Sequence, residues 1–137
     1  MQNKKKKNRY FDWCYIPILK GVFIVVCTDD FKWLDKTFND NGLLDDLTVG
    51  LVFNGEYKGL DAYILVLNLW RHLPASHSII THEVGHITKQ IFKNRGWVKL
   101  KCDEPQCYVQ EWFANKTYQF LKKNKLHTLI VNDNPNQ

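Results

Sequence analysis

The chain has 137 residues, of which 45% are hydrophobic and 14% aromatic, and this fits a single globular domain with one sizeable core, because most domains contain about 100 to 150 residues. Five of its 19 basic residues lie between positions 4 and 9, so the rest of the chain carries 14 basic and 14 acidic residues. This balance argues against a folded body built for nucleic-acid binding, which would need its cations clustered on one face.

The N-terminal segment, the lengths of the apolar runs and the cysteines indicate the kind of environment in which the protein works. Residues 1 to 10 are expected to form a disordered basic arm, because like charges repel one another in a polar tract. The apolar runs are all shorter than the roughly 18 to 20 residues of a membrane-spanning helix, so no membrane partner is expected. Four scattered cysteines do not predict a disulfide framework, and a reducing compartment is expected.

The folded domain is predicted to span residues 11 to 131, with a frayed terminus at 132 to 137. Its first clear element is the β-branched run from Val22 to Cys27, which predicts a buried central strand. Thr28, Asp29 and Asp30, which follow, offer an N-cap to an amphipathic helix from Phe31 to about Asn41.

Two further strands are predicted in the middle of the chain, at Leu47 to Phe53 and at Tyr63 to Leu69. Asn54 with Gly55, and Lys58 with Gly59, supply turn chemistry between them. These strands and the earlier one predict a small antiparallel or mixed sheet.

Two helices are predicted in the second half of the chain. The first spans residues 79 to 95, has its apolar side chains on one broad face, and ends at Gly96. The second opens at Asp103, with Pro105 in its first turn, and runs towards Leu121. A sheet followed by two helices predicts the α+β class.

The strongest chemical signal is the motif H-E-x-x-H, formed by His82, Glu83 and His86 within the first of these helices. Two imidazoles at positions i and i+4 project from one face of a helix and can bind a single zinc ion. Glu83, beside the pair, is placed to act as the general base for an attacking water.

Histidines on an amphipathic helix are often ordinary exposed residues. This is the simpler interpretation of His82 and His86. The motif is interleaved with apolar residues, so part of the helix is expected to be buried, and burying two imidazoles beside a carboxylate is costly unless something such as a metal pairs them. Gly85, in mid-helix, costs about 1 kcal/mol relative to alanine and suggests the close approach of another backbone.

A hydrolytic zinc site needs a third protein ligand and leaves the fourth position to water. Glu104 is the preferred candidate, because the Asp103-Glu104-Pro105 helix entry fixes the backbone there. Glu111, two turns later on nearly the same face, is the main alternative, and Asp103 is a weaker one.

The stretch from Ile79 to Leu121 resembles the small zincin-type metallopeptidase-like proteins common in tailed bacteriophages. In that family, a helix with H-E-x-x-H is followed by a short glycine-containing connection and a helix that begins D-E-P-x-A-Y. This chain has the motif at residues 82 to 86, Gly96 in the connection, and D-E-P-Q-C-Y at residues 103 to 108, with Cys107 in place of the usual alanine.

The resemblance implies a gluzincin-like zinc site with Glu104 as third ligand, an upstream sheet whose edge strand lies over the cleft, and a location in the host cytoplasm or in the virion. A more distant similarity to the ImmA/IrrE-like metallopeptidases rests on their E-x-x-A-N pattern, which Glu111 to Asn115 match. This second similarity keeps Glu111 as an alternative ligand.

The prediction is therefore a compact α+β zincin-like domain that binds one Zn²⁺ through His82, His86 and Glu104 and hydrolyses a peptide or related amide bond. Glu83 is predicted to take a proton from the attacking water and to pass it to the leaving amine. The strand from Tyr63 to Leu69 is expected to pair with an extended peptide substrate by strand addition.

Two rival functions come from other classes. The first is a structural or virion-associated protein that keeps a zincin fold and its zinc without turnover, although a purely structural site has no use for a base such as Glu83. The second is nucleic-acid binding through the Lys4 to Arg9 run alone, with the zinc incidental.

Other residues that can carry chemistry have simpler interpretations. His72 and His77 precede the motif, but loop histidines are more often exposed than catalytic. Tyr108 is expected to pack in the core. Cys102 and Cys107 lack a second cysteine pair, which argues against a thiolate zinc site.

Overall fold

The structure is a computed structural model that describes residues 6 to 17, 19 to 38, 49 to 71, 75 to 96 and 104 to 132. Residues 1 to 5 of the predicted basic arm, and all but the first residue of the predicted frayed terminus, therefore lie outside the described residues. The chain forms two compact units, Met1–Pro74 and Ala75–Gln137, and each is described by itself. Its class is mixed α+β, as the sequence predicted.

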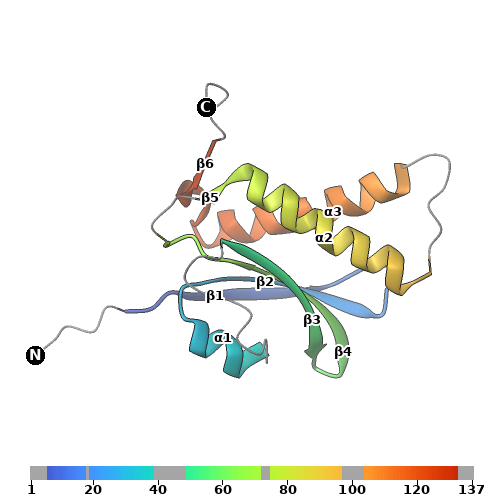
Figure 1. Cartoon of the computed structure of the whole chain (residues 1–137), viewed down its shortest axis with the longest axis horizontal. Coiled ribbons are helices and arrows are strands. Elements are labelled where there is room, and N and C mark those ends of the chain that lie inside the picture. The colour runs from blue at the N-terminus through green and yellow to red at the C-terminus, as the bar shows by residue number, and fades with distance from the viewer. Residues whose placement is uncertain (1–5, 18, 39–48, 72–74, 97–103, 133–137) are drawn as a thin grey trace, which may run out of the picture. The chain divides into compact units, whose positions relative to one another are not determined.

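The first unit contains one mixed sheet of four strands in the order β1-β2-β4-β3 (Figure 1). Strands β1 and β2 are antiparallel, β2 and β4 are parallel, and β3 and β4 are antiparallel. The β-branched run forms the central strand β2, as predicted, and all its residues are buried. The bounds are β1 (Arg9–Tyr15), β2 (Gly21–Thr28), β3 (Gly50–Tyr57) and β4 (Leu60–Leu67).

Helix α1 (Phe31–Phe38) covers one face of this sheet through Leu34 and Phe38. Because side chains alternate between the two faces of a strand, every second residue of β2 and β4 points towards the helix. Phe53 of β3 completes the same buried cluster. The other sheet residues in it are Val22, Ile24, Val26, Ala62, Ile64 and Val66.

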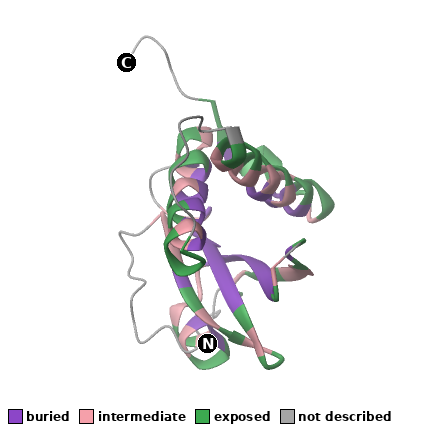
Figure 2. Ribbon diagram, turned by 90° about the vertical axis from the view of Figure 1, so that its right-hand side faces the viewer, coloured by how far each residue is buried: buried purple, intermediate pink, exposed green. Residues whose placement is uncertain are grey.

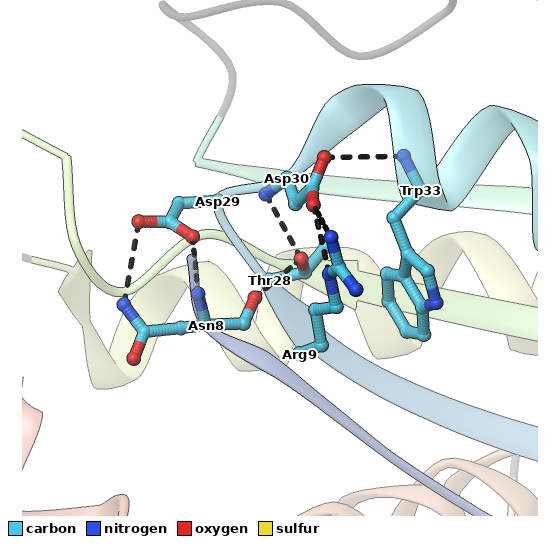
Figure 3. Close-up of polar contacts among 6 residues, drawn as sticks. All are labelled: Asn8, Arg9, Thr28, Asp29, Asp30 and Trp33. Carbon is cyan, nitrogen blue, oxygen red and sulfur yellow. Dashed lines mark hydrogen bonds and ion pairs between the residues drawn. The ribbon is translucent and has the colours of Figure 1, made fainter. Parts of the chain in front are cut away.

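The start of α1 is fixed by Asp30, as its predicted capping role requires. The Asp30 carboxylate accepts a hydrogen bond from the Trp33 backbone N–H at 3.1 Å and forms an ion pair with Arg9 at 2.6 Å (Figure 3). Burial by itself raises the pKa of Asp30, but the Trp33 N–H, the Arg9 guanidinium and the charge of Lys7 outweigh burial and hold the pKa below its usual value.

Asn8 is tied to the end of β2 by hydrogen bonds. Its backbone N–H donates to the Asp29 carboxylate at 2.7 Å, and its carbonyl accepts from the Thr28 hydroxyl at 2.6 Å (Figure 3). Arg9 and Tyr10, which the sequence analysis placed in the disordered arm, therefore belong to β1 instead. The reason is non-local, since the partners that hold this segment lie about 20 residues further along the chain.

The hairpin between β3 and β4 turns at Lys58 and Gly59, one of the two predicted turns. Both residues have positive φ, 51° and 77°, as expected for the two central residues of a type I′ turn. The other predicted turn, at Asn54 and Gly55, is wrong, because both residues pair with β4 inside β3. Pairing with a buried neighbour strand has overridden their local turn preference.

The expectation that Tyr63 to Leu69 accepts a substrate strand is also wrong. Residues 60 to 67 form β4, which is hydrogen-bonded to β2 on one side and to β3 on the other. A strand with both sides paired has no free N–H or C=O row to offer. The edges of this sheet are β1 and β3.

The second unit consists of two antiparallel helices and a short parallel strand pair (Figure 1). The longest elements are α2 (His77–Asn94) and α3 (Glu104–Lys123), close to their predicted bounds. Figure 2 shows α2 with a buried side and an exposed side, as its apolar spacing predicted. The remaining elements are β5 (Ala75–Ser76), the 3-10 helix η1 (His127–Leu129) and β6 (Ile130–Val131).

The end of α2 matches its predicted signal. Gly96 follows the helix with a φ of 64°, the left-handed conformation that glycine adopts without strain. Its N–H bonds to the Lys93 carbonyl at 3.2 Å. None of the described helices combines the length and the apolar character needed to cross a bilayer.

Candidate metal centre

Helix α2 brings the three residues of the motif together. Ile80, Val84 and Ile87 are buried and anchor one side of the helix, which leaves His82 and His86 exposed on another side. The expected burial of the two imidazoles is therefore wrong, and only Glu83 of the motif is buried. Because positions i and i+4 lie one above the other on a helix, the local fold alone is enough to pair the two imidazoles.

The two imidazoles converge on one point. Their Nε2 atoms are 3.0 Å apart, and the rings are nearly perpendicular, at 88°. Two nitrogens, each about 2.0 to 2.1 Å from one zinc ion at a tetrahedral angle, would lie about 3.4 Å apart. The observed separation is therefore close to what a shared metal requires, and without a metal one ring N–H donates to the other ring nitrogen.

Glu83 adds a carboxylate to this pair. The possible ligand atoms of His82, Glu83 and His86 all lie within 4.8 Å of one another. Glu83 is only 7% exposed, and this burial raises its pKa, while the two histidines act in the opposite direction. A carboxyl group with a raised pKa, beside two metal-type ligands, is suited to accept and release a proton.

Among the described residues, Gly85 lacks the close backbone neighbour that a mid-helix glycine predicted. No atom of the described residues comes within 4 Å of the position that a Cβ would take, apart from its chain neighbours and its own helix backbone. The glycine instead leaves the helix surface open beside the histidine pair.

The predicted third ligand, Glu104, is the first residue of α3, but its side chain and the whole of Asp103 lie outside the described residues. The alternative, Glu111, is described and exposed. Among the described side chains, the group that can hold a metal contains only His82, Glu83 and His86. The assignment of Glu104 stays a prediction.

The remaining candidates have other surroundings. His77 bonds to Tyr118 at 2.7 Å through Nδ1, a contact for which the sequence gives no signal, since the partners are 41 positions apart. Tyr108 is 66% exposed, so its predicted place in the core is wrong. Cys107 is exposed, and His72 and Cys102 lie outside the described residues.

One residue near the pair was not singled out from the sequence. Gln90 follows His86 by one helical turn, and its buried Oε1 has no hydrogen-bond partner among the described residues. It therefore accepts no hydrogen bond from His82 or His86, and the structure does not assign it a role at the pair.

Comparison of the chain with protein-family models, with curated proteins and with solved structures found no significant match. The residues around His82 and His86 therefore carry the functional inference.

Proposed function

We propose that this protein is a zinc-dependent hydrolase that cleaves a peptide or related amide bond. The convergence of the His82 and His86 Nε2 atoms at 3.0 Å supports this proposal most strongly, and buried Glu83 lies beside them. His82, His86 and Glu104 would hold the ion as two nitrogens and one oxygen, a donor set suited to zinc with one position left open.

The chemistry follows from the role of each residue. A bound zinc ion would polarise the scissile carbonyl and lower the pKa of the attacking water to about 7. Glu83 would accept the proton of that water and then donate it to the leaving amine. Its burial favours the first of these steps, because a carboxylate whose pKa is raised accepts a proton more readily than a surface glutamate does.

A zincin-like fold is part of the same proposal. The order of elements, with a mixed sheet before the motif helix and a further helix after it, agrees with what the resemblance to phage metallopeptidase-like proteins implies. The intact base at Glu83 favours turnover over a purely structural zinc site.

Metal analysis of the purified chain tests the proposal. The wild type should carry close to one zinc per molecule, and the His82→Ala, His86→Ala double variant should carry almost none. His127→Ala, which removes an exposed histidine of η1, is the matched control and should keep its zinc. Stoichiometric zinc in the double variant would refute the proposal, because the metal would then sit elsewhere.

A further inference from the structure

The exposed side of α2 continues beyond the histidine pair as a row of lysines. At 3.6 residues per turn, His82, His86, Lys89 and Lys93 fall within a stripe about 60° wide. All four are exposed. The row therefore leads from the candidate metal centre towards the end of the helix.

This stripe carries positive charge that none of the described residues neutralises. Neither Lys89 nor Lys93 forms an ion pair with any described residue. Glu83 is the only acidic residue in α2, and it is buried beside the pair rather than exposed among the lysines. An anionic group bound here would meet two ammonium groups and no competing carboxylate from the same helix.

Gly85 widens the approach to the stripe. It lies one turn before Lys89 and next to His86 in sequence, and the volume that a Cβ would take is open among the described residues. A ligand can therefore lie close against the helix backbone between the histidines and the first lysine.

We infer that the stripe of His82, His86, Lys89 and Lys93, with Gly85 beside it, selects substrates that carry a carboxylate close to the bond attacked. The inference rests on the proposed function and names its substrate class as acidic peptides. Lys89 and Lys93 lie about 4.5 and 10.5 Å of helix beyond His86. An extended peptide advances about 3.3 Å per residue, so the carboxylate would lie about one to three residues from the scissile bond.

Two matched probes test this inference on the zinc-loaded full chain. One is a succinate-derived hydroxamate with a free carboxylate, and the other is the same compound with a carboxamide in its place. The wild type should bind the acidic probe roughly 3- to 10-fold more tightly at low salt, a preference that shrinks as salt screens exposed charges. The Lys89→Met, Lys93→Met variant should lose the preference, whereas Lys122→Met, on exposed α3 surface, should keep it.

Three outcomes would overturn the inference. Equal wild-type affinity for both probes, or an acidic preference that survives in the double lysine variant, contradicts charge selection but leaves the zinc site standing. Failure of both probes to bind a chain that carries zinc contradicts the open metal position itself, and the proposed function falls with the inference.

Discussion

Nδ1 of His77 lies 2.7 Å from the hydroxyl oxygen of Tyr118, and the two rings stack with centroids 5.6 Å apart. This contact joins the first residue of α2 to the last third of α3. The two helices are antiparallel (Figure 1). The contact between His77 and Tyr118 therefore determines which residues of α3 lie at the same height along the helix axes as the histidine motif.

Removing the Tyr118 hydroxyl should weaken this contact without removing the ring. Tyr118→Phe is expected to lower the free energy of unfolding by about 0.5 to 1.5 kcal/mol, the net value of a typical hydrogen bond. Urea denaturation measures the change. Tyr108→Phe, on the exposed side of the same helix, is the control and should change stability by less than about 0.5 kcal/mol. Equal effects of the two variants would show that the hydroxyl contact contributes nothing.

The same register bears on the third metal ligand. At a rise of about 1.5 Å per residue, His82 and His86 lie about 7.5 and 13.5 Å beyond His77, while Glu111 lies about 10.5 Å from Tyr118. Glu111 is therefore level with the motif, yet its side chain is exposed and does not join the imidazoles. Lying at the same height along the helix axis as the motif is therefore not enough to make Glu111 a ligand.

Single substitutions separate the two glutamates. Glu104→Ala is expected to lose most of its zinc affinity, because the resemblance implies Glu104 as a direct ligand. Glu111→Ala should lose affinity by at most about 10- to 100-fold, the range for outer-shell partners of a metal site. Zinc titration against a competing chelator measures both. The reverse order would assign the ligand to Glu111 and correct the present assignment.

The parts of the fold that the sequence predicts well are those that depend on local patterns. The buried run of β2, the face of α2 and its end at Gly96 follow from residue spacing within one element. The motif is equally local, so the pairing of His82 with His86 needs only a helix. For this reason the core of the candidate site was predictable.

The failures involve contacts between distant segments. Tyr63 to Leu69 is an almost continuous apolar run, which predicts a buried strand, but the run does not say which strands pair with it, and the pairing of β4 with both β2 and β3 makes it central. Arg9 belongs to β1 because Asn8 and Arg9 meet Asp29 and Asp30. No periodicity within a single segment encodes such partners, and the same is true of the proposed third ligand, Glu104, which lies on a different helix from the histidines.

The ion pair between Arg9 and Asp30 should make the free energy of unfolding depend on pH in the acidic range. Because the pKa of Asp30 is below its usual value in the fold, the resulting stabilisation is present above the unfolded pKa of about 3.9 and disappears as the pH falls through the folded value. Arg9 is half-exposed, so the difference should stay within about 1 kcal/mol.

The Asp30→Asn variant isolates this effect, since asparagine caps a helix about as well as aspartate does. Denaturation of wild type and variant should differ most between pH 5 and 7 and converge below the unfolded pKa of about 3.9. A difference that stays constant down to the lowest pH would show that the charge of Asp30 is not its cause.

Gly85→Ala tests the open space beside this position in α2. Since a Cβ there would meet no atom of the described residues within 4 Å beyond its chain neighbours and its own helix backbone, the variant should gain about 1 kcal/mol of stability from the higher helix propensity of alanine. Gly59→Ala is the contrasting variant, because φ is 77° at that turn and alanine should cost about 1 kcal/mol. Thermal unfolding of both variants measures the signs. Destabilisation by Gly85→Ala would mean that another segment approaches the helix there.

Glu83→Gln separates catalysis from metal binding. Glutamine is nearly isosteric with glutamate but cannot accept a proton from water at neutral pH, so the variant should keep its zinc and lose hydrolysis by about 100- to 10,000-fold. Its stability at pH 7 should be no lower than that of the wild type, because the raised pKa of Glu83 shows that burial disfavours the ionised carboxylate.

The assay for this variant starts from a broad peptide mixture with the zinc-loaded chain and detects new amino termini. Cleavage that persists undiminished in Glu83→Gln would exclude Glu83 as the base. Cleavage by neither protein, with zinc bound in both, would instead favour a structural role for the metal. His127→Ala should cleave as the wild type does, since this exposed histidine lies on η1, outside the motif. If the His127→Ala control also lost activity, the loss of cleavage in Glu83→Gln would reflect general unfolding of the chain rather than removal of the base.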